Sequence, residues 1–167
     1  MRVGDKVEDF ELQNQNGETV RLTDYKASPV VLFFYPRADT PGCTIESCGF
    51  RDAFTQFKKA GIVVFGVSRD TVKAQKKFQE KYDLPYDLLA DPEMVLIKRY
   101  GLLVNKTMYG KPVTGVARTT YVIGPDEGKG QRLLHIFEQV TPQGHAEEVF
   151  ALLKESGGAG AKAKGKS

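Results

Sequence analysis

Two cysteines, Cys43 and Cys48, are the residues whose type and spacing most directly suggest chemistry in this chain of 167 residues. Their spacing is too wide for a Cys-x-x-Cys redox loop, and two thiols without a nearby pair of histidines do not complete the tetrahedral shell of a zinc ion. A thiol chemistry that uses the two sulfurs one after the other remains. Because a cysteine on an apolar helix face is often only a small core residue, an inert role also stays open.

A helix predicted from Thr40 to Ala60 carries both cysteines, and we expect it to end at Gly61. The apolar residues that recur at helical spacing along it are Phe50, Phe54 and Phe57. Helix geometry places Cys43 within ~20 to 40° of this apolar face and turns Cys48 away by ~140°. The two Cα atoms then lie ~8.6 Å apart, beyond the ~7 Å limit for a disulfide. A bond between them requires local unwinding of the helix.

Cys43 is the candidate nucleophile because it lies in the first turn of this helix. The positive end of the helix dipole and the free backbone N–H groups there favour a thiolate over a thiol. Thr40, one turn earlier, is placed to accept a backbone N–H as a helix cap and to offer its hydroxyl to the sulfur or to a substrate oxygen. Pro36 and Pro41 have fixed φ angles, so we expect them to stiffen the loop that borders the site.

Alternating strands and helices surround the cysteine helix. Strands are predicted at Val30 to Tyr35, Ile62 to Val67 and Tyr86 to Leu89, and helices at Val72 to Tyr82, capped by Ser68 or Asp70, and from Asp91-Pro92 to Gly101. Hairpins are predicted from Phe10 to Leu22 about Asn16-Gly17, and from Thr119 to Phe137, before a last helix from Pro142 to Glu155. These elements predict an α/β fold with a mostly parallel core sheet and helices on both faces. By analogy the layout is thioredoxin-like: a central mixed sheet with an N-terminal hairpin.

Composition is typical of a globular chain, with 41% hydrophobic and 27% charged residues. We expect one domain over residues 1–155 and a disordered tail of glycine, alanine and lysine over residues 156–167. The tail's three lysines account for the net charge of +3, and three spaced lysines are a weak signal for nucleic acid. The longest apolar run is too short to span a membrane. The start of the chain lacks a secretory signal, which predicts a reducing cytoplasm.

The pattern Pro36-x-x-x-Thr40-x-x-Cys43 resembles the active-site signature of the peroxiredoxin family. The longer stretch Thr40-Pro41-Gly42-Cys43-Thr44-x-Glu46-x-Cys48, followed by Phe50-Arg51-Asp52, resembles its bacterioferritin comigratory protein or PrxQ branch. Further matches are Phe10 with Leu12, Tyr100-Gly101, Met108 to Lys111 and Gly115 to Tyr121. The resemblance covers roughly residues 3 to 155.

The resemblance implies a thiol peroxidase for hydrogen peroxide and organic hydroperoxides. Cys43 would attack the O–O bond and become a sulfenic acid, and Cys48 would resolve it as an intramolecular disulfide. By motif, Arg118 completes the site, and Thr40, Gly42 and Cys43 line the substrate position with it. The resemblance also implies a monomer without metal or organic cofactor, with thioredoxin as the expected reductant and glutaredoxin as the alternative. The glycine-rich turn at 124–130 and the tail lie outside the family pattern.

Two other functions are compatible with the sequence. A general disulfide oxidoreductase would want a cysteine partner closer to Cys43, and a redox-controlled binding or chaperone module would keep the thiol switch without turnover. Taken alone, Arg118 would be read as a surface ion pair. Glu46 is expected to orient the helix, with Arg51 as its partner or as a structural tie. The two histidines, His135 and His145, match no motif and are expected to be structural.

Overall fold

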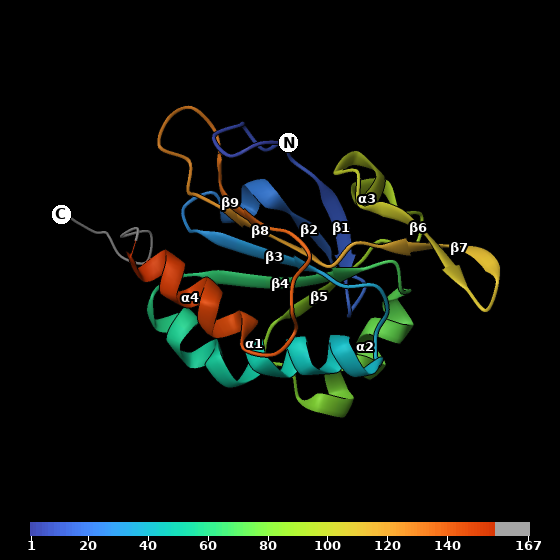
Figure 1. Cartoon of the computed structure of the whole chain (residues 1–167). Coiled ribbons are helices and arrows are strands. Elements are labelled where there is room, and N and C mark those ends of the chain that lie inside the picture. Colours follow the sequence, from blue (N-terminus) through green and yellow to red (C-terminus); the bar gives the residue numbers. More distant parts are fainter. Residues whose placement is uncertain (156–167) are drawn as a thin grey trace.

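A seven-stranded mixed sheet organises residues 1–155, the part of the chain that the computed structural model describes (Figure 1). The expected tail, residues 156–167, lies outside the described residues. The strand order is β2-β1-β5-β4-β3-β8-β9. The strands are β1 (Glu11–Asn14), β2 (Thr19–Arg21), β3 (Val30–Phe34), β4 (Val63–Ser68), β5 (Asp87–Ala90), β8 (Thr119–Ile123) and β9 (Leu133–Phe137).

The predicted parallel core is confirmed for the three strands that alternate with helices, because β3–β4 and β4–β5 pair in parallel. The N-terminal hairpin β1–β2 adds to β5 in antiparallel register, and the hairpin β8–β9 adds to β3 in the same way. Each hairpin was expected, but local periodicity does not tell which edge of the sheet a hairpin will join. The resulting mixed sheet agrees with the expected thioredoxin-like fold.

Strand β3 is buried along its whole length, as its continuous apolar run predicts. Its side chains alternate between the two faces, so Val31 and Phe33 enter one hydrophobic cluster while Leu32 and Phe34 enter the other. Gly66 on the neighbouring strand makes room for Phe33, because a Cβ atom there would lie 2.8 Å from the Phe33 ring. The strand that leads into the cysteine helix is therefore fixed by packing on both faces.

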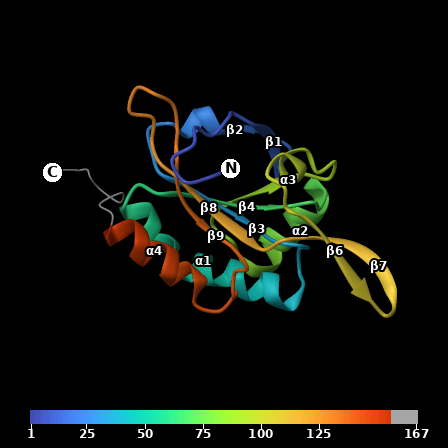
Figure 2. The ribbon, with the colours of Figure 1, turned by 45° about the horizontal axis from the view of Figure 1, so that its top comes forward.

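Helices cover both faces of the sheet, as predicted (Figures 1 and 2). Helices α1 (Pro41–Lys59), α2 (Val72–Tyr82) and α4 (His145–Glu155) pack on one face. The opposite face is covered by the 3-10 turn η1 (Leu22–Tyr25), the short helix α3 (Val95–Arg99) and the N-terminal segment. Within residues 1–155, no helix combines the length and the apolar character needed to cross a membrane.

Two expected helix starts differ from the structure. The α2 helix is capped by Thr71, whose hydroxyl accepts the Ala74 N–H, rather than by Ser68 or Asp70. The helix expected from Asp91-Pro92 is shorter, because Asp91 accepts three backbone N–H groups across a non-helical turn in which Met94 has a φ of 58°. The Asp91 carboxylate therefore caps a helix that begins only at Val95.

A hairpin of β6 (Leu103–Met108) and β7 (Lys111–Val116) was not predicted from the sequence. It forms a separate two-stranded sheet that extends away from the body (Figure 2). Most of its side chains outside the strand ends are exposed. The hairpin therefore lacks the alternation of apolar and polar residues from which a strand is predicted. The sequence feature that indicates this hairpin is the turn at Tyr109-Gly110, where both residues adopt positive φ angles.

Candidate active site

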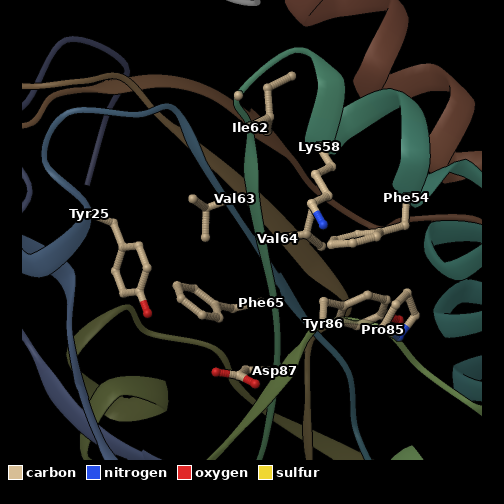
Figure 3. Close-up of a pocket in the computed structure, with 11 residues that line it drawn as sticks. Tyr25, Phe54, Lys58, Ile62, Val63, Val64, Phe65, Pro85, Tyr86 and Asp87 are labelled. Atoms are coloured by element: carbon tan, nitrogen blue, oxygen red, sulfur yellow. The ribbon is translucent and has the colours of Figure 1, made fainter.

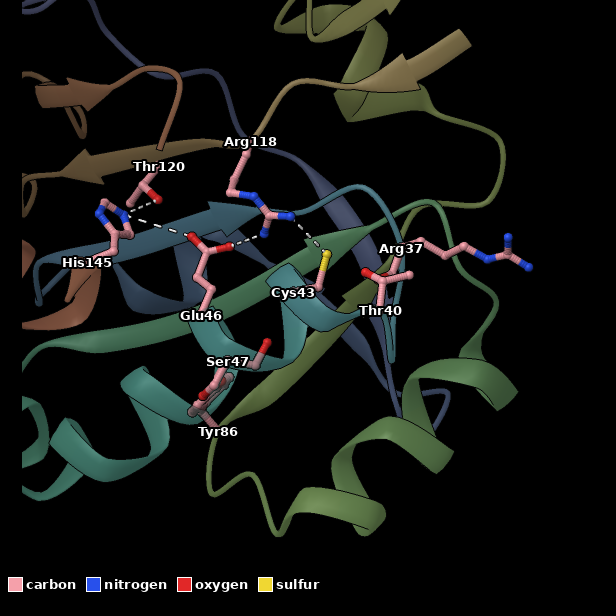
Figure 4. A network of polar contacts seen from close by, with 9 residues as sticks. All are labelled: Arg37, Thr40, Cys43, Glu46, Ser47, Tyr86, Arg118, Thr120 and His145. Carbon is pink, nitrogen blue, oxygen red and sulfur yellow. Dashed lines mark hydrogen bonds and ion pairs between the residues drawn. The ribbon is translucent and has the colours of Figure 1, made fainter. Parts of the chain in front are cut away.

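Cys43 lies in the first turn of α1, and the loop from Tyr35 to Thr40 joins the end of β3 to this helix (Figure 4). Its side chain is fully buried, whereas that of Cys48 on the following turn is only partly buried. Both are free thiols. The predicted placement of Cys43 toward the core and Cys48 away from it is confirmed.

Arg118 reaches the sulfur of Cys43 from the short link between β7 and β8. One guanidinium nitrogen, Nη2, donates to Cys43 Sγ at 3.4 Å, and the other, Nη1, donates to Glu46 Oε1 at 2.8 Å (Figure 4). Only 18% of the Arg118 side chain is exposed, so it is not the surface ion pair that its sequence context alone suggested. A guanidinium at this distance favours a negative charge on sulfur.

Gly42 allows this approach of Arg118. A Cβ atom at position 42 would lie 3.0 Å from Arg118 Nη2, which is tighter than ordinary van der Waals contact. The backbone of Gly42 is helical and needs no positive φ, so the glycine serves the close approach rather than the fold. This gives a physical reason for glycine beside the candidate nucleophile.

Thr40 is the residue that precedes α1, as expected, but its side chain does not cap the helix. Its hydroxyl donates instead to the backbone carbonyl of Arg37 at 2.9 Å. The predicted capping bond is therefore wrong, because the tight turn from Arg37 to Thr40 supplies a nearer acceptor. With its proton used in this way, Thr40 Oγ1 offers the site only its lone pairs, as an acceptor.

The loop that carries Pro36 and Thr40 is held from outside the helix. Asp39 has a φ of 59°, and its carboxylate accepts hydrogen bonds from Lys81 Nζ and Tyr82 Oη, each at 2.8 Å. The hydrogen bond from Lys81 is the main reason why the pKa of Asp39 is lowered. The Ala38 N–H donates to Asp70 at 2.7 Å. The stiff loop predicted from the prolines is thus also tied to α2 and to the end of β4.

Glu46 is buried on the inner side of α1, one turn after Cys43. Burial raises its pKa to about 7, although the ion pair with Arg118 acts in the opposite direction. The expected alternative partner, Arg51, instead pairs with Asp52 and donates to the Tyr82 carbonyl. Glu46 therefore orients Arg118, and Arg51 is a tie between α1 and the end of α2.

His145 is a residue of this network that the sequence did not reveal, because no motif surrounds it. It begins α4, and its Nε2 lies 4.0 Å from Glu46 Oε2 and 2.8 Å from Thr120 Oγ1 (Figure 4). His135, by contrast, lies on β9, where its ring packs against that of Phe137. Among residues 1–155, no group of three or more histidine, cysteine, aspartate or glutamate side chains is arranged to hold a metal ion.

A separate apolar cavity of about 370 Å³ lies at the opposite ends of the parallel strands (Figure 3). It forms where β4 extends beyond β5, whose first residue, Asp87, pairs with Phe65. Tyr25 and Phe65 line one side of β4, and Phe54 and Tyr86 line the other. No cysteine lines this cavity, so it lies apart from the thiol chemistry at the carboxyl end of β3.

Comparisons with known proteins identify relatives of this chain. A family model described as the AhpC/TSA family matches residues 3–129. A putative peroxiredoxin bcp of Coxiella burnetii is 43% identical over 92% of this chain and 99% of its own length. A cysteine-to-serine variant of Xylella fastidiosa PrxQ superposes with a TM-score of 0.86 at 34% identity, covering 93% of this chain and 97% of that one.

A third relative carries a description of its activity. The Xanthomonas campestris bacterioferritin comigratory protein, described for alkyl peroxide reduction, gives a TM-score of 0.80 at 33% identity, over 88% of this chain and 91% of its own. The matched family model covers most of the chain, including the stretch with both cysteines and Arg118. The chain therefore belongs to the AhpC/TSA family and, within it, is a peroxiredoxin of the Bcp and peroxiredoxin Q type.

Proposed function

We propose that this peroxiredoxin, a thiol-dependent peroxidase, uses Cys43 as its peroxidatic nucleophile and reduces hydrogen peroxide and small organic hydroperoxides. The observation that carries the proposal is the contact of Arg118 Nη2 with Cys43 Sγ at 3.4 Å in a buried helix start. The cation and the helix N-terminus both stabilise a thiolate there. Alkyl peroxide reduction by the Xanthomonas relative supports the substrate class.

In the proposed first step, the Cys43 thiolate attacks the nearer oxygen of the peroxide. The O–O bond breaks, an S–O bond forms, and the departing alkoxide or hydroxide takes up a proton to leave as alcohol or water. Arg118 stabilises the charge that grows on the departing oxygen. Thr40 Oγ1, whose own proton is donated to the Arg37 carbonyl, is available to accept the peroxide O–H and orient it. Gly42 keeps the path between Arg118 and the sulfur open.

In the proposed second step, the Cys48 thiol attacks the Cys43 sulfenic acid and releases water, leaving a disulfide within α1. Because α1 is helical from Pro41 to Lys59, both cysteines lie on regular helix, which separates their Cα atoms by ~8.6 Å. The helix must therefore open locally before the bond forms. A dithiol reductant, for which we propose thioredoxin, then restores both thiols by exchange. We propose that the protein does this as a monomer in the cytoplasm.

A coupled assay tests the proposal. Reduced protein is mixed with hydrogen peroxide or a small alkyl hydroperoxide in the presence of thioredoxin, its reductase and NADPH. We expect NADPH oxidation that depends on peroxide and continues over many turnovers, and glutaredoxin with glutathione should be slower in a parallel assay. A single stoichiometric burst without turnover would instead identify a redox switch, and activity toward disulfide substrates without peroxide would identify a disulfide oxidoreductase.

A further inference from the structure

One oxygen of the buried Glu46 carboxylate has no hydrogen-bond partner. Oε1 accepts from Arg118, but Oε2 accepts nothing within the described residues, although the side chain is fully buried. A carboxylate oxygen left alone in the interior is costly. The His145 ring faces it, with Nε2 at 4.0 Å. A hydrogen bond between the two would need a closure of about 1 Å.

His145 connects this buried carboxylate to solvent. Its Nδ1 lies 3.0 Å from Oε1 of Glu148, whose side chain is 62% exposed. Since a carboxylate only accepts, Nδ1 carries the proton in the neutral ring, and Nε2 then accepts from the Thr120 hydroxyl. Glu148 also lines a surface cavity of about 290 Å³ under the start of α4. Polar groups thus lead from Cys43 Sγ through Arg118, Glu46 and His145 to the surface (Figure 4).

The charges in this cluster do not balance when every group takes its usual form. A Cys43 thiolate and a Glu46 carboxylate carry two negative charges against the single positive charge of Arg118. In a buried site a net charge is unfavourable, and one additional proton removes it. The charged groups that face the His145 ring are Arg118, Glu46 from α1 and Glu148 from its own helix. Burial raises the pKa of Glu46 to about 7 and lowers the pKa of His145, which places that proton mainly on Glu46.

We propose that His145 and Glu46 form a proton-holding pair that retains one proton while Cys43 is a thiolate and releases it when the sulfur is oxidised. The inference rests on the proposed role of Cys43. Attack converts the thiolate and the peroxide into a neutral sulfenic acid and an alkoxide or hydroxide. Once the charge on sulfur is gone, Arg118 and an ionised Glu46 balance each other, so the pair gives up one proton. That proton matches the one that the departing oxygen takes up.

In this scheme His145 is a positioning residue rather than a catalytic one, because it acts on the sulfur only through Glu46 and Arg118. It contacts the unpartnered side of the carboxylate and offers the pair an exchange route through Glu148. A histidine that merely packs would not sense the state of Cys43. Its ring contacts with Phe50 and Phe137 would remain the same whether the sulfur is charged or neutral.

Nitrogen NMR of the histidine rings tests the pair without any turnover. The chain has only two histidines, so ¹⁵N-histidine labelling gives His145 with His135 as an internal control. In reduced wild type between pH 5 and 9, we expect the His145 ring nitrogens to shift with a midpoint near the Glu46 pKa of about 7. In Cys43→Ser, which has no thiolate, the midpoint should fall by about one pH unit. In Glu46→Gln the transition should vanish.

Unchanged His145 signals between wild type and Cys43→Ser across this range would overturn the proposal. This comparison carries the test even if Glu46→Gln fails to fold, and the His135 signals report whether each variant keeps its fold. The result is also separable from the proposed function, because no peroxide is present. If the protein is a peroxidase but its His145 signals do not depend on Cys43, only the proton-holding pair is ruled out. If the His145 signals depend on Cys43 but the protein has no peroxidase activity, the peroxidatic role of Cys43 is ruled out.

Proton counting gives a second readout. One equivalent of peroxide is added to reduced protein near pH 6.5 in a weak buffer with a pH indicator. Wild type should take up only about half a proton per Cys43, because a fall of the Glu46 midpoint from about 7 to about 6 releases roughly half a proton at this pH. Glu46→Gln should take up about one proton per Cys43, and His135→Gln should behave as wild type. Equal uptake in wild type and Glu46→Gln would contradict the proposal.

Discussion

Cys43 and Cys48 lie on one helix but in opposite surroundings. Cys43 is fully buried against the sheet, with the Arg118 guanidinium on its sulfur. Cys48 is partly exposed on the other side of α1, where partial burial raises its pKa despite the nearby charge of Arg51. On the proposed mechanism, the first environment suits the nucleophile and the second suits the resolving cysteine. This difference supports the proposal that the position of each cysteine around the helix determines its role, and that the two sulfurs can meet only when the helix changes shape.

The anchors of α1 differ along its length in the same way. Phe50 stacks on Phe33 with ring centroids 4.5 Å apart, and the carbonyl of Ser47 accepts a hydrogen bond from Tyr86 Oη at 2.6 Å. Before this point, the first turn is held by the contacts of Cys43 and Glu46 with Arg118. In the proposed mechanism, oxidation of Cys43 removes the negative charge that attracts Arg118. Local opening is therefore expected to begin in the first turns and to end near Phe50.

The largest expected effect comes from exchanging the two sulfurs separately. Cys43→Ser should abolish peroxidase activity with the fold intact, because it removes the thiol at the helix start. Cys48→Ser should still be oxidised once by peroxide, but its sulfenic acid should persist, over-oxidise or pair between chains. Intact-mass spectrometry after one equivalent of peroxide distinguishes them. More than about a tenth of wild-type turnover in Cys43→Ser would rule out this nucleophile.

Removing the Arg118 charge should have the next largest effect. Arg118→Met should slow the reaction of Cys43 with peroxide by about 10² to 10³-fold, because both thiolate stabilisation and support of the departing oxygen are lost. Arg118→Lys is the matched control, since it keeps the charge without the fork that reaches Glu46 and Cys43 together. Its rate should fall between those of Met and wild type. Stopped-flow or competition kinetics measure this step, and equal rates in all three proteins would show that Arg118 is only structural.

Substitutions at two glycines of α1 should affect different steps of the reaction, peroxide attack and disulfide formation. Gly42→Ala should slow peroxide attack by about tenfold, because its Cβ atom would displace Arg118 by entering a 3.0 Å contact. Gly49→Ala meets only Ala146 at 3.8 Å, so attack should be unchanged. Alanine there should stabilise the helix by up to about 1 kcal/mol and slow disulfide formation by roughly fivefold. Rapid-quench mass spectrometry resolves the two steps, and a slower attack in Gly49→Ala would contradict this division.

The smallest expected effect concerns stability and pH. Because the pKa of Glu46 rises from 4.5 to about 7 on folding, the folded state binds more protons than the unfolded state between these values. The contribution of Glu46 to the free energy of unfolding is therefore present below pH 4.5 and is lost as the pH rises toward 7. Glu46→Gln should lack this loss. Urea unfolding of both reduced proteins at pH 5 and 7.5 measures it, and an identical pH dependence would contradict it.

Sequence alone predicted the parts of this account that depend on local pattern. The buried strand before the cysteines, the cysteine helix and the opposite directions of Cys43 and Cys48 all follow from periodicity. Arg118 was found only by family resemblance, because 75 residues separate it from Cys43. The hairpin β6–β7 was missed because its side chains are mostly exposed. His145 was missed because its meaning depends on tertiary contact with Glu46, which no spacing reports.

Amide exchange of the oxidised protein tests the central claim most directly. Wild type treated with one equivalent of peroxide should become two hydrogens lighter and yield one linked Cys43–Cys48 peptide. Hydrogen exchange followed by mass spectrometry should then show faster exchange from Thr44 to Phe50 than in the reduced protein, with β3 unchanged. A linked peptide with unchanged exchange in that segment, or an oxidised protein without that link, would contradict the account.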